Sequence, residues 1–169
     1  MTMKPGKAFV AGVVGGAVMS VCLAVARLLG MPVNLEMMLG TMTGMAPGSG
    51  TWVLGLIMHL VISGLIALAY AFGFEHVSHR SGALPGVVFS LVHIVIGGLF
   101  MGLMPAIHPM VPERMAAPGA FMSNVGDVGV IAFVVLHAIY GAVVGVMYGP
   151  VVHPAAPIER RVIGRRAMA

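Results

Sequence analysis

The sequence predicts an all-α membrane protein, a bundle of four transmembrane helices. Of its 169 residues, 59% are hydrophobic and only 8% are charged, whereas a water-soluble domain carries about a quarter charged residues. The mean hydropathy is +1.03. Four apolar runs reach the ~20 residues that cross a bilayer as a helix, and the charges lie almost entirely in the segments between them.

We expect a single transmembrane domain over residues 1–150, followed by a basic cytoplasmic tail at 151–169. The predicted spans are about 8–29, 51–74, 84–103 and 128–148. Thr51 and Asp127 are residue types that cap helix N-termini. Pro32 and Pro105 follow the first and third spans, and a proline cannot continue the helical hydrogen-bond ladder.

The distribution of basic residues predicts the orientation. One side carries Lys4, Lys7, Arg80, Arg160, Arg161, Arg165 and Arg166. The other side carries Arg27, which can pair with Glu36 or extend to the interface, and Arg114. Because cytoplasmic loops are enriched in Lys and Arg, we expect both termini in the cytoplasm of a prokaryotic cell, with a multi-pass protein in its inner membrane.

The chain shows signs of an internal duplication. Both the first and the third span end in a Gly and Met-Pro stretch, and each is followed by an outer loop that contains Ala-Pro-Gly. The next span then places a histidine eleven residues before a tyrosine, as His59 with Tyr70 and His137 with Tyr148. Because each unit crosses the membrane twice, we expect two parallel helical-hairpin repeats.

Glycines recur at four-residue steps in the spans, a spacing that places them on one helix face. Such faces let helix backbones approach closely in a membrane. The predicted packing positions are Gly12, Gly16, Gly98, Gly102, Gly141, Gly145 and Gly149. We expect them to pack inside the bundle; the alternative is that one groove, such as that of the last span, receives a partner subunit.

Three segments resemble a group of small four-span prokaryotic integral membrane proteins whose function is not assigned. They are LEMMLGTMTG (35–44), MHLVISGLIALAYAF (58–72) and LHAIYGAVVGVMYG (136–149). The resemblance covers roughly residues 8–149, supports the four-span topology and implies no activity. The outer loop at 105–126 departs from the shorter connection of that group.

His59, His93 and His137 are predicted at similar depth, roughly 12–15 Å below the outer end of the spans at ~1.5 Å per residue. A polar ring in hydrocarbon usually faces the bundle interior. Together these three residues are the candidate cofactor site, for haem b or for a metal such as copper. The alternative is that each ring bonds a facing Ser63, Ser90, Tyr140 or backbone carbonyl. No Asp or Glu falls inside a predicted span, which argues against a carboxylate proton relay.

The outer loops are rich in methionine, whose thioether is a soft ligand that suits Cu(I). The candidate outer metal ligands are Met37, Met38, Met42, His108 and Met110. Because their spacing matches no fixed copper motif, the competing interpretation is an apolar outer cap or docking surface.

Among functions, the leading hypothesis is a non-enzymatic accessory or structural subunit that packs against a larger membrane complex. Its expected partners are membrane lipid and either another protein or further copies of the chain. The alternatives are a haem- or copper-binding membrane protein that uses the mid-membrane histidines, and a small transporter or channel. We predict no catalytic residue, and no nucleic-acid partner because the chain has no basic stripe on a polar surface.

Overall fold

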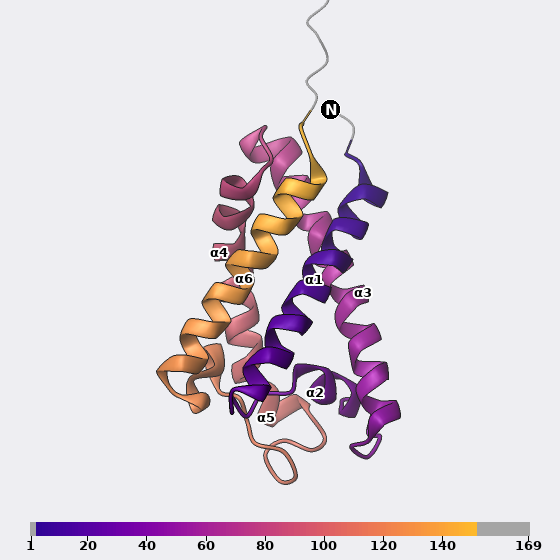
Figure 1. The fold of residues 1–169 in the computed structure, drawn as a ribbon, viewed down its shortest axis with the longest axis vertical. Coiled ribbons are helices and arrows are strands. Elements are labelled where there is room, and N and C mark those ends of the chain that lie inside the picture. Colours follow the sequence, from indigo (N-terminus) through magenta and orange to yellow (C-terminus); the bar gives the residue numbers. More distant parts are fainter. Residues whose placement is uncertain (1–2, 152–169) are drawn as a thin grey trace, which may run out of the picture.

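The computed structural model describes residues 3–151, and all its regular elements are helical (Figure 1). They are α1 (Pro5–Leu28), α2 (Leu35–Thr41), α3 (Ser49–Gly73), the π-helical η1 (Phe74–Ser78), α4 (Ala83–Gly102), α5 (Met104–Ile107), the 3₁₀-helical η2 (Ala120–Val125) and α6 (Asp127–Tyr148). The arginines of the predicted basic tail lie outside the described residues. Four helical stretches, α1, α3 with η1, α4 and α6, are long and apolar enough to cross a membrane. The prediction of a four-helix membrane bundle is confirmed at this level.

The helix ends differ from the prediction in two places. Thr51 does not cap α3, because the helix already begins at Ser49 and the Thr51 hydroxyl donates to the carbonyl of Ala46 at 2.7 Å. Asp127 makes no capping bond at the start of α6. At its other end α3 continues through η1 as far as Ser78, where His79 leaves the helix with a φ of 52°. The second membrane stretch is therefore longer than expected.

The long helices are arranged so that α1 and α6 lie together at the centre, with α3 against α1 and α4 against α6 (Figure 1). α3 and α4 scarcely touch each other. The start of α1, the end of η1 and the end of α6 meet at one end of the bundle, where Ser81 donates to the carbonyl of Gly149. α2 and α5 lie at the opposite end (Figure 1).

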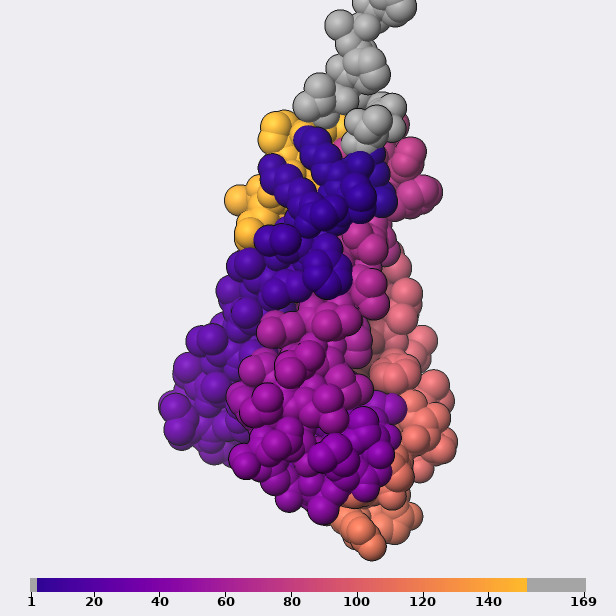
Figure 2. All heavy atoms as spheres, turned by 90° about the vertical axis from the view of Figure 1, so that its right-hand side faces the viewer, coloured from indigo at the N-terminus to yellow at the C-terminus, as the bar shows by residue number. Residues whose placement is uncertain are grey.

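Glycines allow close contacts within two pairs of membrane helices, α1 with α3 and α4 with α6. A Cβ atom on Gly12 of α1 would overlap the Ser63 carbonyl and Gly64 of α3. Figure 2 shows the face on which the spheres of α1 and α3 meet. A Cβ on Gly86 of α4 would overlap the Gly141 carbonyl of α6, and one on Gly141 would overlap Gly86 in return. Both grooves are filled from within the same chain.

The remaining predicted packing positions serve different contacts. Gly16 lies against Ser63, and Gly145 against the carbonyl of Gly82. Gly98 and Gly102 of α4 face Phe121 and Ala120, so they accommodate η2 rather than another membrane helix. Gly149 follows the end of α6 with a φ of 71°, where a glycine lets the chain leave the helix.

We predict that Gly86→Ala destabilises the bundle by about 1–3 kcal/mol, because the added methyl group would push α4 away from the α6 backbone. Thermal unfolding of the purified protein in detergent measures this change. Gly50→Ala is the matched control, since no atom lies within 4 Å of its new Cβ, and a surface change of this kind alters stability by about 0.5 kcal/mol at most. Equal unfolding midpoints for the two variants would refute the contact.

Candidate functional site

Three helices each contribute one histidine to a single cavity inside the bundle. His59 of α3, His93 of α4 and His137 of α6 line a space of about 190 Å³. Four methionines share its wall: Met19, Met38, Met101 and Met104. The rest of the lining is apolar apart from Ser63, and no charged side chain contributes. The cavity lies between α3 and α4, whose backbones approach each other at few positions.

Each of the three imidazoles is held by its Nδ1 atom. His137 Nδ1 lies 2.7 Å from the carbonyl oxygen of Phe133, His59 Nδ1 lies 3.0 Å from the Ser20 hydroxyl, and His93 Nδ1 lies 3.3 Å from the Tyr70 hydroxyl. The predicted kinds of partner, a serine and a backbone carbonyl, occur at His59 and His137. The named side chains differ: Ser90 donates to the Val87 carbonyl, and Tyr140 donates to the carbonyl of Ser63.

The partner of His137 also fixes its tautomer. A carbonyl oxygen only accepts, so a neutral His137 carries its hydrogen on Nδ1 and has a lone pair on Nε2. Within the described part of the chain, the Nε2 atoms of all three histidines form no hydrogen bond. Metal-binding histidines commonly have this arrangement, with one nitrogen held by a protein acceptor and the other free to coordinate.

Two of the histidines are close neighbours. The rings of His93 and His137 stand edge to face with their centroids 4.6 Å apart. Gly97 leaves room beside them, because a Cβ there would lie 3.4 Å from His137 Nε2. Across residues 3–151, however, no three His, Cys, Asp or Glu side chains are grouped closely enough to hold a metal ion. The structure thus brings two imidazoles into contact and places His59 elsewhere on the same cavity wall.

The predicted outer metal ligands do not share one cavity, and His108 is bonded to other residues. Both ring nitrogens of His108 are used: Nδ1 accepts from the Met110 amide at 3.1 Å, and Nε2 lies 2.9 Å from the Met38 carbonyl and 3.2 Å from the Thr41 hydroxyl. His108 therefore fastens α2 to the segment after α5. Of the predicted thioethers, Met38 lines the histidine cavity, whereas Met37, Met42 and Met110 do not.

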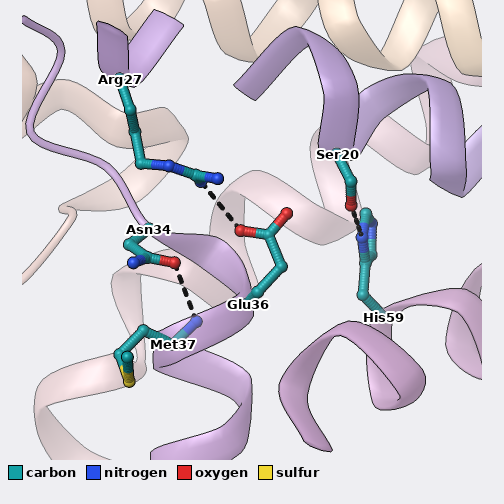
Figure 3. Close-up of polar contacts among 6 residues, drawn as sticks. All are labelled: Ser20, Arg27, Asn34, Glu36, Met37 and His59. Carbon is teal, nitrogen blue, oxygen red and sulfur yellow. Dashed lines mark hydrogen bonds and ion pairs between the residues drawn. The ribbon is translucent and has the colours of Figure 1, made fainter. Parts of the chain in front are cut away.

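Sequence reasoning named the Arg27–Glu36 pair but missed how deeply Glu36 is buried. Glu36 on α2 is 0% exposed and receives Arg27 Nη1 on its Oε2 at 2.9 Å (Figure 3). Its Oε1 has no hydrogen-bond partner. Glu36 also lies within electrostatic range of His59. The apolar residues around it, LEMML, were the available sign that this acid faces inward.

A second buried acid lies at the opposite end of the bundle. Glu75 in η1 is 1% exposed, and its Oε1 accepts from the Tyr148 hydroxyl at 2.6 Å. The Lys4 amide donates to the same hydroxyl at 3.2 Å, while Oε2 of Glu75 has no partner. Since the second membrane stretch runs to Ser78, the expectation that no acid falls inside a span is wrong.

Comparison with known proteins gives no family to compare these features with: no family model, curated protein or solved structure matches the sequence. The resemblance to the four-span prokaryotic group stays a prediction.

We predict that Arg27→Met destabilises the protein by about 3 kcal/mol, the lower end of the range for breaking a buried ion pair, because Arg27 is partly exposed. The change leaves the Glu36 carboxylate buried without its counter-charge. Adding Glu36→Gln to the same chain should recover most of the loss. Denaturant unfolding in detergent measures both changes, and Arg114→Met, at an exposed position, is the control. A double variant no more stable than Arg27→Met would contradict this account.

Proposed function

We propose that this multi-pass membrane protein is a non-enzymatic binding protein for a transition-metal ion, with His93 and His137 as ligands. The observation that carries the proposal is the free Nε2 lone pair of His137, fixed by its Nδ1 bond and lying beside His93 in a cavity. The lone pair has no hydrogen-bond partner within residues 3–151. A coordinated metal ion would give it one.

The other ligands come from the same cavity wall. Met101 and Met104 line the same cavity as the two imidazoles, so thioethers are available as ligands in place of a third histidine. Imidazole and thioether together form a donor set that suits copper. This deepens the sequence-based hypothesis of a copper-binding membrane protein.

The size of the cavity favours a metal ion over haem b. Its volume of about 190 Å³ is below the roughly 300 Å³ at which pockets begin to take drug-sized organic ligands, and a porphyrin is larger than most of these. The free nitrogens therefore suit a small ligand.

A small transporter is the second candidate function. Buried acids inside a membrane bundle mark ion or proton pathways in many transporters, and Glu36 and Glu75 are buried at opposite ends of this one. Movement of bound metal across proteoliposomes would support transport, and retention of the metal would favour storage or handling. The hypothesis of an accessory subunit stays a prediction. The glycine grooves of α1 and α6 are already filled by other helices of the same chain, so these grooves do not support it.

We infer further that both termini face the cytoplasm of a prokaryotic cell, in its inner membrane. Lys4, Lys7 and Arg80 lie at the end of the bundle where the chain starts, and Lys4 Nζ donates to the Pro150 carbonyl at 3.0 Å. At the other end the charge of Arg27 is offset by Glu36. The excess of positive charge at the end where the chain starts supports the orientation expected from the positive-inside rule.

We also infer that the bundle arose from two parallel helical hairpins, α1–α3 and α4–α6. In the first, Gly12 meets Ser63, and Ser20 bonds His59. In the second, Gly86 meets Gly141, and His93 contacts His137. In both hairpins a glycine contact is followed along the first helix by a contact to a histidine, and this shared order supports the duplication.

The orientation predicts which introduced cysteines react with a membrane-impermeant maleimide in intact cells. In a Cys22→Ser background, Glu113→Cys should be labelled, because Glu113 is exposed in the outer loop. His76→Cys, exposed at the other end, should be labelled only after lysis. Labelling of His76→Cys alone in intact cells would reverse the orientation.

Metal content tests the histidine cavity. Purified protein loaded anaerobically should hold a stoichiometric metal ion, and His137→Ala should weaken binding at least roughly tenfold, about 1.4 kcal/mol. His137→Gln keeps more of the side-chain volume and should show the same loss, and His76→Ala is the exposed control. Full binding by a folded His93→Ala/His137→Ala variant would overturn the assignment.

A further inference from the structure

The histidine cavity is the innermost of three adjacent spaces that extend towards the surface at the α2 end of the bundle. The outermost, the vestibule, has about 490 Å³ and lies between the segment 27–34 and the segment 115–125. The next, the throat, has about 30 Å³. Val33 lines both vestibule and throat, and Leu35 and His137 line both throat and histidine cavity. The three spaces are therefore neighbours in a series from the surface to His137, here called the route, and the side chains that they share stand between them.

Methionines line every part of this route. The vestibule has Met31, Met38 and Met115, the throat has Met19, Met101 and Met122, and the cavity has Met19, Met38, Met101 and Met104. Several of these residues line two spaces, so thioethers extend from the mouth of the vestibule to the imidazoles. Apolar packing alone does not require one residue type at every step.

We propose that the ion is Cu(I) and that it enters through the vestibule, passing from thioether to thioether until it reaches His93 and His137. This rests on the proposed metal-binding function and specifies the ion and its path. Thioethers are soft donors that select Cu(I) among the biological first-row metals. Transfer between them changes no oxidation state and moves no proton, because thioether and neutral imidazole both bind the ion without deprotonation.

The charge of the route supports a monovalent ion. No carboxylate or thiolate lines the throat or the cavity, and Cys22 lines neither. The free energy needed to move an ion from water into a low-dielectric space rises with the square of its charge. Neutral donors therefore offset the transfer of Cu(I) more readily than that of Zn²⁺ or Cu²⁺.

The small volume of the throat also favours Cu(I) over a divalent ion. A space of about 30 Å³ holds about one or two water molecules, since each needs roughly 10–15 Å³ by this measure. A divalent ion with its hydration shell does not fit. An ion that exchanges its water molecules for thioethers in the vestibule does fit. Arg27, the charged residue of the vestibule lining, is offset by Glu36 at 2.9 Å and so presents little barrier to a cation.

The identity of the ion is tested by competition on the full-length Cys22→Ser protein in detergent. Cu(I), kept reduced with ascorbate under anaerobic conditions, is offered against bicinchoninate, and Zn²⁺ is offered in a parallel titration. We expect Cu(I) to bind at least tenfold more tightly, with the binding lost in His137→Ala. Equal binding of Zn²⁺ at His137 would overturn the Cu(I) assignment and leave the metal site standing. Absence of any histidine-dependent binding would overturn both.

The path is tested by the rate at which Cu(I) loads. Met31→Leu/Met115→Leu removes two vestibule thioethers and leaves the cavity ligands intact, so loading should slow several-fold while the equilibrium affinity stays the same. The control is Met42→Leu/Met45→Leu, which removes two outer methionines that do not line the route.

Because Met115 also accepts a hydrogen bond from Thr41 at 3.3 Å, the single Met31→Leu variant is measured beside the double one, and thermal midpoints confirm that both fold. Equal loading rates for the vestibule and control variants would exclude this path. A parallel loss of equilibrium affinity in the vestibule variants would place the bound ion in the vestibule instead.

Discussion

Close contact between helix backbones at glycine decides where this bundle is packed and where it is open. In a bilayer the hydrophobic effect does not drive helices together, so van der Waals contact has a larger share in holding them. Gly12 brings α1 against α3, and Gly86 brings α4 against α6. The two pairs join where the ring of Tyr140 covers Gly15. With these contacts satisfied, the backbones of α3 and α4 stay farther from each other, side chains such as Tyr70 and His93 bridge them, and the histidines border the space between them.

Several buried polar groups share a pattern in which one atom is bonded and another has no hydrogen-bond partner, whereas the buried His108 uses both ring nitrogens. The histidines are bonded at Nδ1 and free at Nε2. Glu36 is paired at Oε2 and Glu75 at Oε1, each with its second oxygen unpartnered. Because buried polar atoms in folded proteins are nearly always hydrogen-bonded, unpartnered atoms of this kind mark positions where a ligand has something to bind.

The sequence predicts the parts of this structure that depend on local pattern. The number and approximate place of the four long apolar helices follow from residue composition along single segments. The direction of each ring does not, because Ser20 and Tyr70 reach His59 and His93 from other helices. Glu75 was missed because an acid after Phe74 looks like the polar end of a span. In the structure the Tyr148 hydroxyl bonds it inside the bundle, a contact between residues far apart in the chain.

A cation among neutral ligands still needs an anionic charge within range, and Glu36 is placed to supply one. Its Oε2 faces Arg27, while the free oxygen is on the side turned towards Ser20 and His59 (Figure 3). In a low-dielectric interior a charge acts over longer distances than in water, and Glu36 lies within electrostatic range of His59. The ion pair therefore has its unpartnered oxygen on the side of His59, which lines the histidine cavity. This orientation favours a cation in the cavity without a carboxylate in its lining.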